Sequence, residues 1–455
     1  MTVEADAMHT PARLSHWLDR LHTWRRSATW LLTVDLLTVM IAASLPWSTS
    51  ATSILVVLWV IVVAPTIDWE AFVLDLAHPA CALPVLLVAL AVLGTLWADG
   101  PWAVRLHGIK PAAKLLLIPF LLYHFQRTQR GAWVLIAFLA SCMLLMILSW
   151  IVLFFPGLKP AHTLSAGVPV KNYIDQSQEF ALCAFALALP ALIAWRRRKW
   201  KLAASYLALA LAFIANLLFV ALARTALIYM AVLLVLFASR HLGRRSMFAL
   251  LAGAIVVASL IWTNSPYLRQ RIGDIGVEYQ AQDISGIAST AQRLTYWRKS
   301  IKFLAEAPLL GHGTGSIKAQ FTRDAVGQTG LEAEIVSNPH NQTLAIAVQW
   351  GLLGVMLLYA MWLNHLLLFT GRTLAAWFGL VVVVQNVVSS LLNSHLFDFH
   401  EGWIYVLGVG LAGGMSTRAA ARRRAWRHAS VLVSGPDPAV ARRPGRPYVI
   451  GTTNE

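Results

Sequence analysis

The chain has 455 residues, of which 58% are hydrophobic and only 13% are charged, and its formal net charge at pH 7 is +16. Together with a mean hydropathy of +0.63, this composition excludes an ordinary soluble globular protein. Alternation of polar and apolar residues, the pattern of an outer-membrane barrel, does not recur along the chain. The sequence therefore predicts an all-α, polytopic integral membrane protein.

Apolar runs long enough to cross a bilayer, about 17–25 residues each, recur along the chain. We count about twelve, with eleven or thirteen as open alternatives, because two early runs are short and residues 201–239 can be divided differently. They lie near residues 27–45, 52–67, 82–97, 110–125, 132–155, 178–195, 201–220, 224–239, 247–262, 343–369, 373–392 and 402–416.

The basic residues are placed as in a membrane protein and not as in a nucleic-acid-binding protein. They cluster in short loops and tails on alternate sides of successive spans, which is the bias of cytoplasmic loops. Both termini are then cytoplasmic, and the loops 156–177 and 263–342 lie on the opposite face. The loop 65–80 departs from the pattern, because it carries only acidic residues. The basic clusters are Arg25-Arg26, Arg127 with Arg130, Arg196 to Lys199, Arg240 with Arg244-Arg245, and Arg418 to Arg427.

Five segments follow from this pattern. Residues 1–26 form a cytoplasmic N-terminal segment with an interfacial amphipathic helix, and residues 27–262 contain spans one to nine. Residues 263–342 form the long outer-face loop, with a helical pattern from Gln292 to Glu306 and a glycine-rich turn from Gly311 to Gly315. Residues 343–416 contain the last three spans, and residues 417–455 form a flexible basic cytoplasmic tail.

The segment around His340 is the clearest candidate for chemistry. Asn338 is a good N-cap and Pro339 suits the first helical position, which predicts a helix with His340 in its first turn. The helix dipole there favours a neutral imidazole, the form that accepts a proton, and attracts an anion. Gly351 and Gly354 would share or nearly share the histidine's face and let another helix approach closely. The alternative is a histidine that only ends a loop.

Two arginines on the same predicted face can bind an anion. Arg224 interrupts an apolar run, where a charge costs about 2.5–3.5 kcal/mol and usually faces a polar cavity; the alternative is a side chain that snorkels to the interface. Arg293 stands at the start of the helical pattern of the long loop. Because basic residues follow it there, the alternative is that Arg293 only belongs to a solvated face of that helix.

The polar junction before the last span contains a possible metal-binding set, namely His395, Asp398, His400 and Glu401. Their spacing is not that of a known zinc site, and several would point away from one another on a helix or a strand. We therefore predict no metal and interpret Asp398 as a carboxylate that supports the site or binds an acceptor. No Walker A sequence occurs, since Gly311 to Lys318 lacks the Gly-Lys-Ser/Thr ending, and this argues against an ATP-driven pump.

The arrangement His340-Asn341, nine residues, Gly351-x-x-Gly354 resembles the signature of the O-antigen ligase and polymerase superfamily, a group of polyprenyl-diphosphate-dependent membrane glycosyltransferases. The segment Ala223-Arg224-Thr225-Ala226 looks like the family's small-residue–arginine segment, although Ala223 stands where serine is common. The stretch from Gln292 to Gly313 looks like the arginine-to-glycine stretch before the family's histidine. The resemblance covers roughly residues 215–400.

This resemblance implies an O-antigen ligase with a GT-C-like fold in the inner membrane of a Gram-negative bacterium, with its active site facing the periplasm. Its partners would be O-antigen polysaccharide on undecaprenyl diphosphate, a lipid A–core acceptor and the lipid bilayer, and no cofactor is implied. His340 would be the general base of an inverting transfer, and Arg224 and Arg293 would bind the donor diphosphate. Asn341, Asp398, Gly311 and Gly313 would support the site. An O-antigen polymerase and a transporter of lipid-linked glycan remain alternatives.

Overall fold

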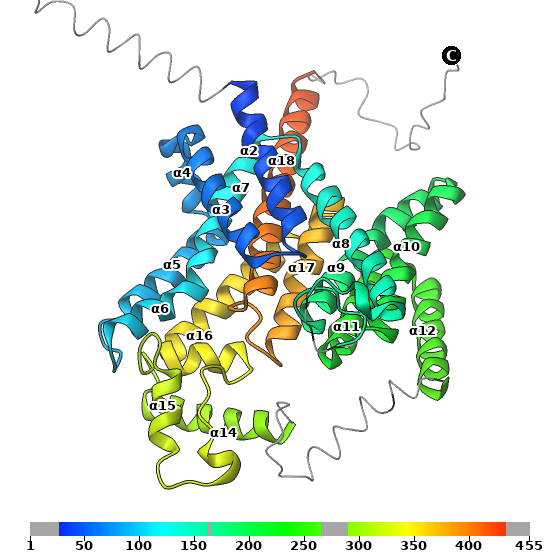
Figure 1. Cartoon of the computed structure of the whole chain (residues 1–455). Helices are drawn as coiled ribbons and strands as arrows, with labels where there is room; N and C mark the ends of the chain where they lie inside the picture. Colours follow the sequence, from blue (N-terminus) through cyan, green and yellow to red (C-terminus); the bar gives the residue numbers. More distant parts are fainter. Residues whose placement is uncertain are drawn as a thin grey trace, which may run out of the picture.

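The computed structural model describes residues 27–161, 163, 165–221, 223–264, 269 and 290–433, and the regular elements among them are all helical (Figure 1). The predicted N-terminal interfacial helix and residues 434–455 of the tail lie outside the described residues. The elements are α2 (Ala28–Ser44), α3 (Thr49–Val63), η1 (Ala64–Thr66), α4 (Trp69–Leu76), α5 (Pro79–Leu93), α6 (Trp102–Ala113), η2 (Lys114–Leu116), α7 (Leu117–Arg127), α8 (Gly131–Phe154), η3 (Pro156–Leu158), α9 (Tyr173–Arg196), α10 (Trp200–Phe219), α11 (Arg224–His241), α12 (Arg244–Asn264), α14 (Thr290–Glu306), α15 (Ile317–Asp324), η4 (Gly330–Ala333), α16 (Gln342–Leu368), α17 (Leu374–Ser390) and α18 (Phe399–Val433).

The all-α polytopic class is confirmed. Eight of the described helices are long and apolar enough to cross a membrane, or nine if the bent pair α4–α5 counts as one span, by length and composition alone. Each predicted apolar run falls on a helix, and the division of residues 201–239 into α10 and α11 is the one that we favoured.

Three local expectations need correction. The acidic loop 65–80 contains a helix, α4, which meets α5 at 85°. The span predicted at 110–125 begins earlier, at Trp102, and changes to a 3-10 turn at Lys114–Leu116. The chain beyond residue 417 is helical as far as Val433, because α18 continues through the basic residues without a proline or glycine to end it.

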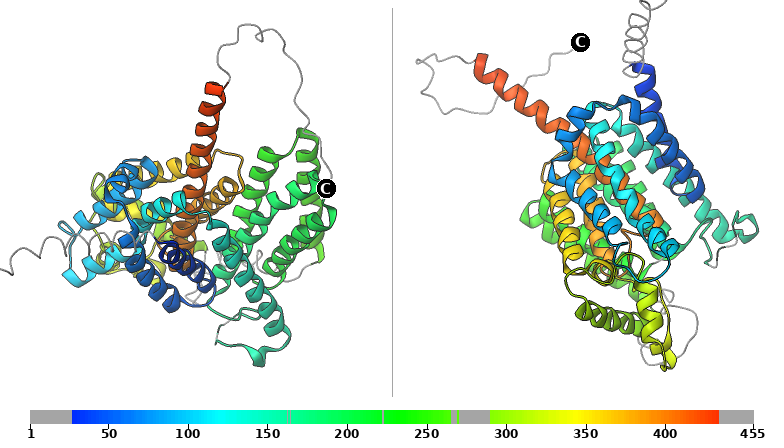
Figure 2. Two further views of the ribbon diagram at one scale, coloured as in Figure 1. Left: turned by 90° about the horizontal axis from the view of Figure 1, so that it is seen from above. Right: turned by 90° about the vertical axis from the view of Figure 1, so that its left-hand side faces the viewer.

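Helices α17 and α18 lie near the middle of the bundle, and α12 lies at its edge with none of its apolar window buried (Figures 1 and 2). Glycines on α18 allow its neighbours to approach closely. A Cβ on Gly410 would stand 2.4 Å from Leu121 Cβ of α7, and one on Gly408 would stand 2.7 Å from Val382 Cγ2 of α17. Small residues of this kind bring helices together in membranes, where no hydrophobic effect drives them.

Helix α16 breaks at Trp350-Gly351, where Gly351 has φ 58° and ψ −158°. The glycine-rich turn of the long loop fills the break. The backbone N–H groups of His312 and Gly313 donate to the carbonyls of Val348 and Gln349 at 2.9 and 2.8 Å, and Leu352 N–H donates to the carbonyl of Pro308 at 2.8 Å. Backbone groups that the break frees from α16 are thus satisfied by the loop, as burial at membrane depth requires.

The glycines of this junction allow the loop to approach α16 and its neighbours closely, and they do not pack two helices together. A Cβ on Gly351 would stand 2.4 Å from the carbonyl oxygen of Leu309, and one on Gly313 would stand 2.4 Å from Ala98 Cα. A Cβ on Gly311 would meet the Trp350 backbone at 2.6 Å, while Gly354 faces side chains of its own helix. The prediction that Gly351 and Gly354 share the face of His340 and admit another helix is therefore wrong, because the helix does not run straight between them.

A second, smaller hydrophobic core joins the long loop to the first half of α16. It contains Tyr296 and Phe303 of α14, Ile317 and Phe321 of α15, and Ala345 and Val348 of α16. The predicted helix over Gln292–Glu306 is confirmed, but its apolar residues Leu294 and Ile301 stay exposed. Residues 290–342 of the loop therefore form a packed cap on one end of the bundle, opposite the end where α2 begins and α18 ends (Figure 1).

We expect Gly351→Ala to lower the free energy of unfolding by more than about 1 kcal/mol, because alanine at positive φ is strained and its Cβ meets backbone. The matched control is Gly253→Ala on α12, where a Cβ meets nothing within 4 Å. Thermal unfolding of the purified protein in detergent measures the difference. Equal melting temperatures for the two variants would contradict the role of the break.

Candidate active site

His340 lies in a tight loop before α16 and not in the first turn of that helix. The N-cap is Asn341, whose Oδ1 accepts the backbone N–H of Leu344 at 3.0 Å. Asn338 instead turns the chain on itself, since its Oδ1 accepts the backbone N–H of His340 at 2.9 Å. The predicted helix start at Asn338-Pro339 is therefore wrong, because a local side-chain bond competes with the helix there. His340 has φ 54°, in the left-handed region that few non-glycine residues adopt.

Asn393 determines which nitrogen of His340 carries the proton. His340 Nδ1 lies 2.9 Å from Asn393 Oδ1, and the same oxygen accepts the backbone N–H of Ser394 at 3.0 Å. Since this oxygen accepts both bonds, the imidazole donates through Nδ1 and keeps its lone pair on Nε2. The Asn393 carbonyl also accepts the N–H of Gln342 at 3.0 Å, which fixes the turn against the start of α16.

The charges around His340 keep the imidazole neutral. Burial lowers its pKa below the ordinary value, and the guanidinium of Arg293 lowers it further. The hydrogen bond that His340 donates to Asn393 and the carboxylate of Asp398 raise the pKa, but they do not overcome burial. His340 is therefore neutral at pH 7. The causes are its burial and the nearby arginine, and not the helix dipole that the sequence suggested.

Helix α14 brings Arg293 to the histidine by packing over its loop. Trp297 Nε1 donates to the carbonyl of Pro339 at 3.1 Å, and the Tyr296 ring stacks on the His340 ring at 6.3 Å between centroids. Tyr296 is held in turn by its hydroxyl bond to the carboxylate of Glu334. Arg293, His340 and Asp398 are thus neighbours in space, although they come from three separate segments.

The turn between α17 and α18 gathers three of the four candidate metal-binding residues. His395 Nδ1 lies 3.4 Å from Asp398 Oδ2 and 3.4 Å from Glu401 Oε1. Our expectation that such residues would point away from one another is wrong for these three, because residues 391–398 form neither a helix nor a strand. Burial alone would lower the pKa of His395, but the carboxylates of Glu401 and Asp398 raise it to about 9.

Among the described residues, His395, Asp398 and Glu401 are the group whose ligand atoms approach closely enough for a cation, within 4.8 Å of one another. A protonated His395 places its positive charge 3.4 Å from a carboxylate oxygen of Asp398 and of Glu401. Binding of a metal would first require that this proton leave, because a metal takes the neutral imidazole. The arrangement therefore suits an internal ion pair better than a metal centre.

Arg224 is the first residue of α11 and is half-buried. The chain just before it is anchored to α9, where Ser177 accepts the backbone N–H of Ala223 at 3.2 Å and donates to the carbonyl of Ala221. Two residues before Ser177 on the same helix lies Asp175, which lines a polar cavity. The structure thus places Arg224 at the α9 side of this end of the bundle, while Arg293 and His340 approach from the capping loop.

The polar cavity has a volume of about 340 Å³. Asn393 belongs to the wall of the cavity and also accepts the hydrogen bond from His340 Nδ1, so the histidine is the direct neighbour of a lining residue. Amides, carboxylates and a hydroxyl make the cavity suitable for the hydroxyl groups of a sugar. Its lining is Thr49, Asn172, Ile174, Asp175, Asn393, His395, Asp398, Phe399, His400 and Glu401.

Sequence reasoning missed two residues of this region. Asn393 stood inside the polar segment that we identified, but a tautomer-fixing amide has no sequence signal of its own. Lys114 is 8% exposed and lies within a span, and a lysine in an apolar run was a usable signal. Asn341, Gly311 and Gly313 hold the backbone of the site together instead of lining the cavity.

The two charges near His340 predict opposite changes of its pKa. Replacing Arg293 with glutamine removes a nearby positive charge and should raise the pKa, whereas Asp398→Asn removes a negative charge and should lower it. NMR titration of histidine-labelled protein in micelles measures both, with His340→Gln to identify the resonance. Shifts of the same sign would refute this arrangement of charges.

Comparison with known proteins agrees with the geometry. A sequence model described as O-antigen ligase matches residues 209–359, a stretch that contains Arg224, Arg293, His340 and the break at Gly351. No curated protein matches the sequence significantly. The match and the membrane-spanning helical fold support a relationship to the O-antigen ligase superfamily, that is, to ligase- or polymerase-type membrane glycosyltransferases.

Proposed function

We propose that the protein is an O-antigen ligase that transfers polysaccharide from undecaprenyl diphosphate to lipid A–core. The observation that carries this proposal is His340, a neutral imidazole whose Nδ1–H is held by Asn393 and whose Nε2 is left to accept a proton. Arg293 lies near it, and its hydrogen-bond partner Asn393 lines a cavity suited to a sugar. Those are the parts that transfer of a glycan to a hydroxyl requires.

In the proposed reaction the acceptor hydroxyl oxygen attacks the anomeric carbon of the donor glycan. The bond from that carbon to the diphosphate oxygen breaks, and its electron pair leaves with the diphosphate. Attack from the face opposite the leaving group inverts the anomeric centre. His340 Nε2 takes the hydroxyl proton as general base, which contributes about 10²–10⁴-fold to the rate.

The departing diphosphate gains negative charge, which arginines stabilise because guanidinium stays protonated and forms paired hydrogen bonds with phosphate. We assign this role to Arg293 and Arg224. Arg293 also lowers the pKa of His340, so one side chain favours both the leaving group and the base. The chemistry assigned to these side chains calls for neither a nucleotide nor a metal.

The arrangement in the membrane follows from the same proposal. The cap formed by residues 290–342 would face the periplasm of a Gram-negative inner membrane, with both termini in the cytoplasm as the basic loops predict. Donor and acceptor lipids would then reach the cavity from the outer leaflet. A polymerase that uses the same carrier is the second candidate, since the family match covers both types.

A lipopolysaccharide gel ladder of a strain with His340→Ala tests the reaction and its type. A ligase without its base should leave bare core lipopolysaccharide and full-length polymer on the carrier lipid. Arg293→Ala should give the same pattern, and the control Arg245→Ala, at the exposed start of α12, should give a normal ladder. Core capped with single repeats would identify a polymerase instead, and a normal ladder for His340→Ala would refute both.

Purified protein separates an enzyme from a transporter. We expect it to join lipid-linked glycan to lipid A–core in detergent without ATP, and to retain this activity in EDTA. A transporter would form no product under any of these conditions. Loss of activity in EDTA that Mg²⁺ restores would contradict the metal-free mechanism.

A further inference from the structure

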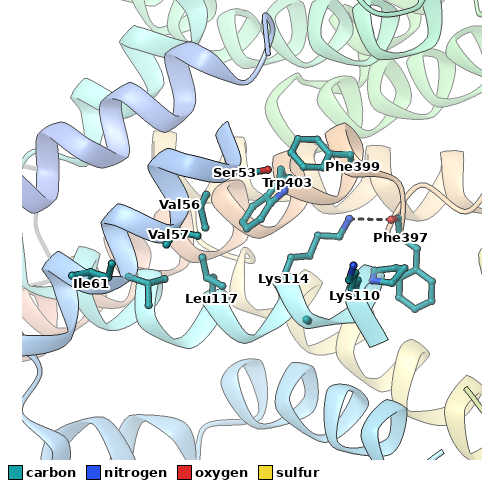
Figure 3. A pocket seen from close by; sticks show the side chains of 13 residues that line it. Ser53, Val56, Val57, Ile61, Lys110, Lys114, Leu117, Phe397, Phe399 and Trp403 are labelled. Atoms are coloured by element: carbon teal, nitrogen blue, oxygen red, sulfur yellow. Dashed lines mark hydrogen bonds between the residues drawn. The ribbon is translucent and has the colours of Figure 1, made fainter. Parts of the chain in front are cut away.

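A wide apolar groove of about 650 Å³ opens between α3, the α6–α7 junction and the start of α18 (Figure 3). Its walls are formed by apolar side chains such as Val57 and Ile61, which are 59% and 62% exposed although they lie within a predicted span. The remaining lining residues are Ser53, Val56, Val60, Lys110, Pro111, Ala113, Lys114, Leu117, Phe397, Phe399 and Trp403.

Two lysines stand together at one end of this groove, away from Ile61 (Figure 3). Lys110 is exposed, whereas Lys114 is nearly buried and donates to the carbonyls of Phe397, at 3.1 Å, and Asp398. A Cβ on Gly402 would stand 2.1 Å from Lys114 Nζ, so the absence of a side chain there makes room for the ammonium. A lysine within a span is costly, which marks such a residue as a candidate ligand contact.

The groove adjoins the polar cavity beside His340. Phe399 lines both spaces. Thr49 of the cavity and Ser53 of the groove lie one turn apart on α3, so they project from the same face of that helix. Along the path from the groove to the cavity, the surface is therefore first apolar, then cationic at the two lysines, and then polar with hydroxyl-binding groups. The candidate base, His340, lies next to the polar part.

This order corresponds to one kind of molecule. We propose that the groove binds the isoprenoid chain of the lipid-diphosphate donor, that Lys110 and Lys114 hold its chain-side phosphate, and that the first sugar occupies the polar cavity. The inference rests on the proposed function, because only a diphosphate separates chain from sugar in such a donor. An acceptor glycolipid with several sugars between its chains and the reacting hydroxyl would not need the three surfaces to adjoin.

The test uses a polyprenyl diphosphate that carries a diazirine on its chain and no sugar. The full-length protein is reconstituted in vesicles of phosphatidylethanolamine and phosphatidylglycerol, irradiated with the probe, and mapped by peptide mass spectrometry. Labelling should concentrate in residues 53–61, 110–117 and 397–403. Unlabelled polyprenyl diphosphate should compete, and added phosphatidylglycerol should not.

Paired variants locate the two parts of the ligand. Val57→Trp should fill the groove and reduce labelling, while Ile136→Trp on α8, which is 63% exposed and does not line the groove, should not. Lys110→Ala should reduce labelling at limiting probe about tenfold, the effect of losing one charge-assisted hydrogen bond. Lys201→Ala, also exposed but at the start of α10, is its matched control.

Labelling spread over the outer face of the bundle, or removed by phosphatidylglycerol, would overturn the inference and make the groove a site for ordinary bilayer lipid. Equal labelling of Val57→Trp and Ile136→Trp would overturn it as well. The probe has no glycan to transfer, so these outcomes do not depend on catalysis. A protein that binds the probe in the groove but transfers no glycan would refute the proposed function alone.

Discussion

The break of α16 at Trp350-Gly351 is the constraint on which the rest of the structure depends. A continuous helix would satisfy its own backbone and would leave the capping loop without its backbone hydrogen bonds to α16. The break exposes carbonyl groups that the backbone of residues 308–313 satisfies instead. Since unsatisfied backbone is very costly at such depth, loop and helix hold each other in place.

The consequence of that junction is the position of α14. Once residues 308–313 are fixed, α14 packs on the first half of α16 through the small core of Tyr296 and Phe303. Arg293 then lies close enough to lower the pKa of His340, and Trp297 donates a hydrogen bond to the Pro339 carbonyl. The strained backbone of His340 persists because Asn338, Asn393 and the α14 aromatics contact it from different sides. Strain supported in this way is typical of a preorganised site.

The features that repeat along the chain could be predicted from the sequence. Apolar runs gave the spans, and the amphipathic run after Gln292 gave α14. The predicted start of α16 was wrong because Asn338 and Asn341 are both good caps. Asn338 bonds locally to the backbone of His340, while Asn341 caps the helix and is also held by the Leu391 carbonyl at the end of α17. Gly351 was singled out from the sequence for close helix packing, whereas in the structure it breaks α16. A helix break that a distant loop fills has no local sequence pattern.

The candidate site was predictable in its residue types and not in its geometry. His340, Arg224 and Arg293 were identified from motif and topology, whereas the amide of Asn393 that fixes the tautomer depends on a turn without periodicity. The convergence of His395, Asp398 and Glu401 has the same origin. Their ion pairs are formed by chain segments whose side-chain directions no helix or strand rule describes.

The central claim is that neutral His340 accepts the proton of the acceptor hydroxyl. Its most direct test is the initial rate of glycan transfer by the purified protein between about pH 5 and pH 8. Because burial lowers the pKa of His340, the account predicts a constant rate near neutrality and a fall only below the ordinary histidine range, with this acidic limb absent from the residual activity of His340→Ala. A rate that rises as the pH falls, or an unchanged acidic limb in that variant, would contradict it.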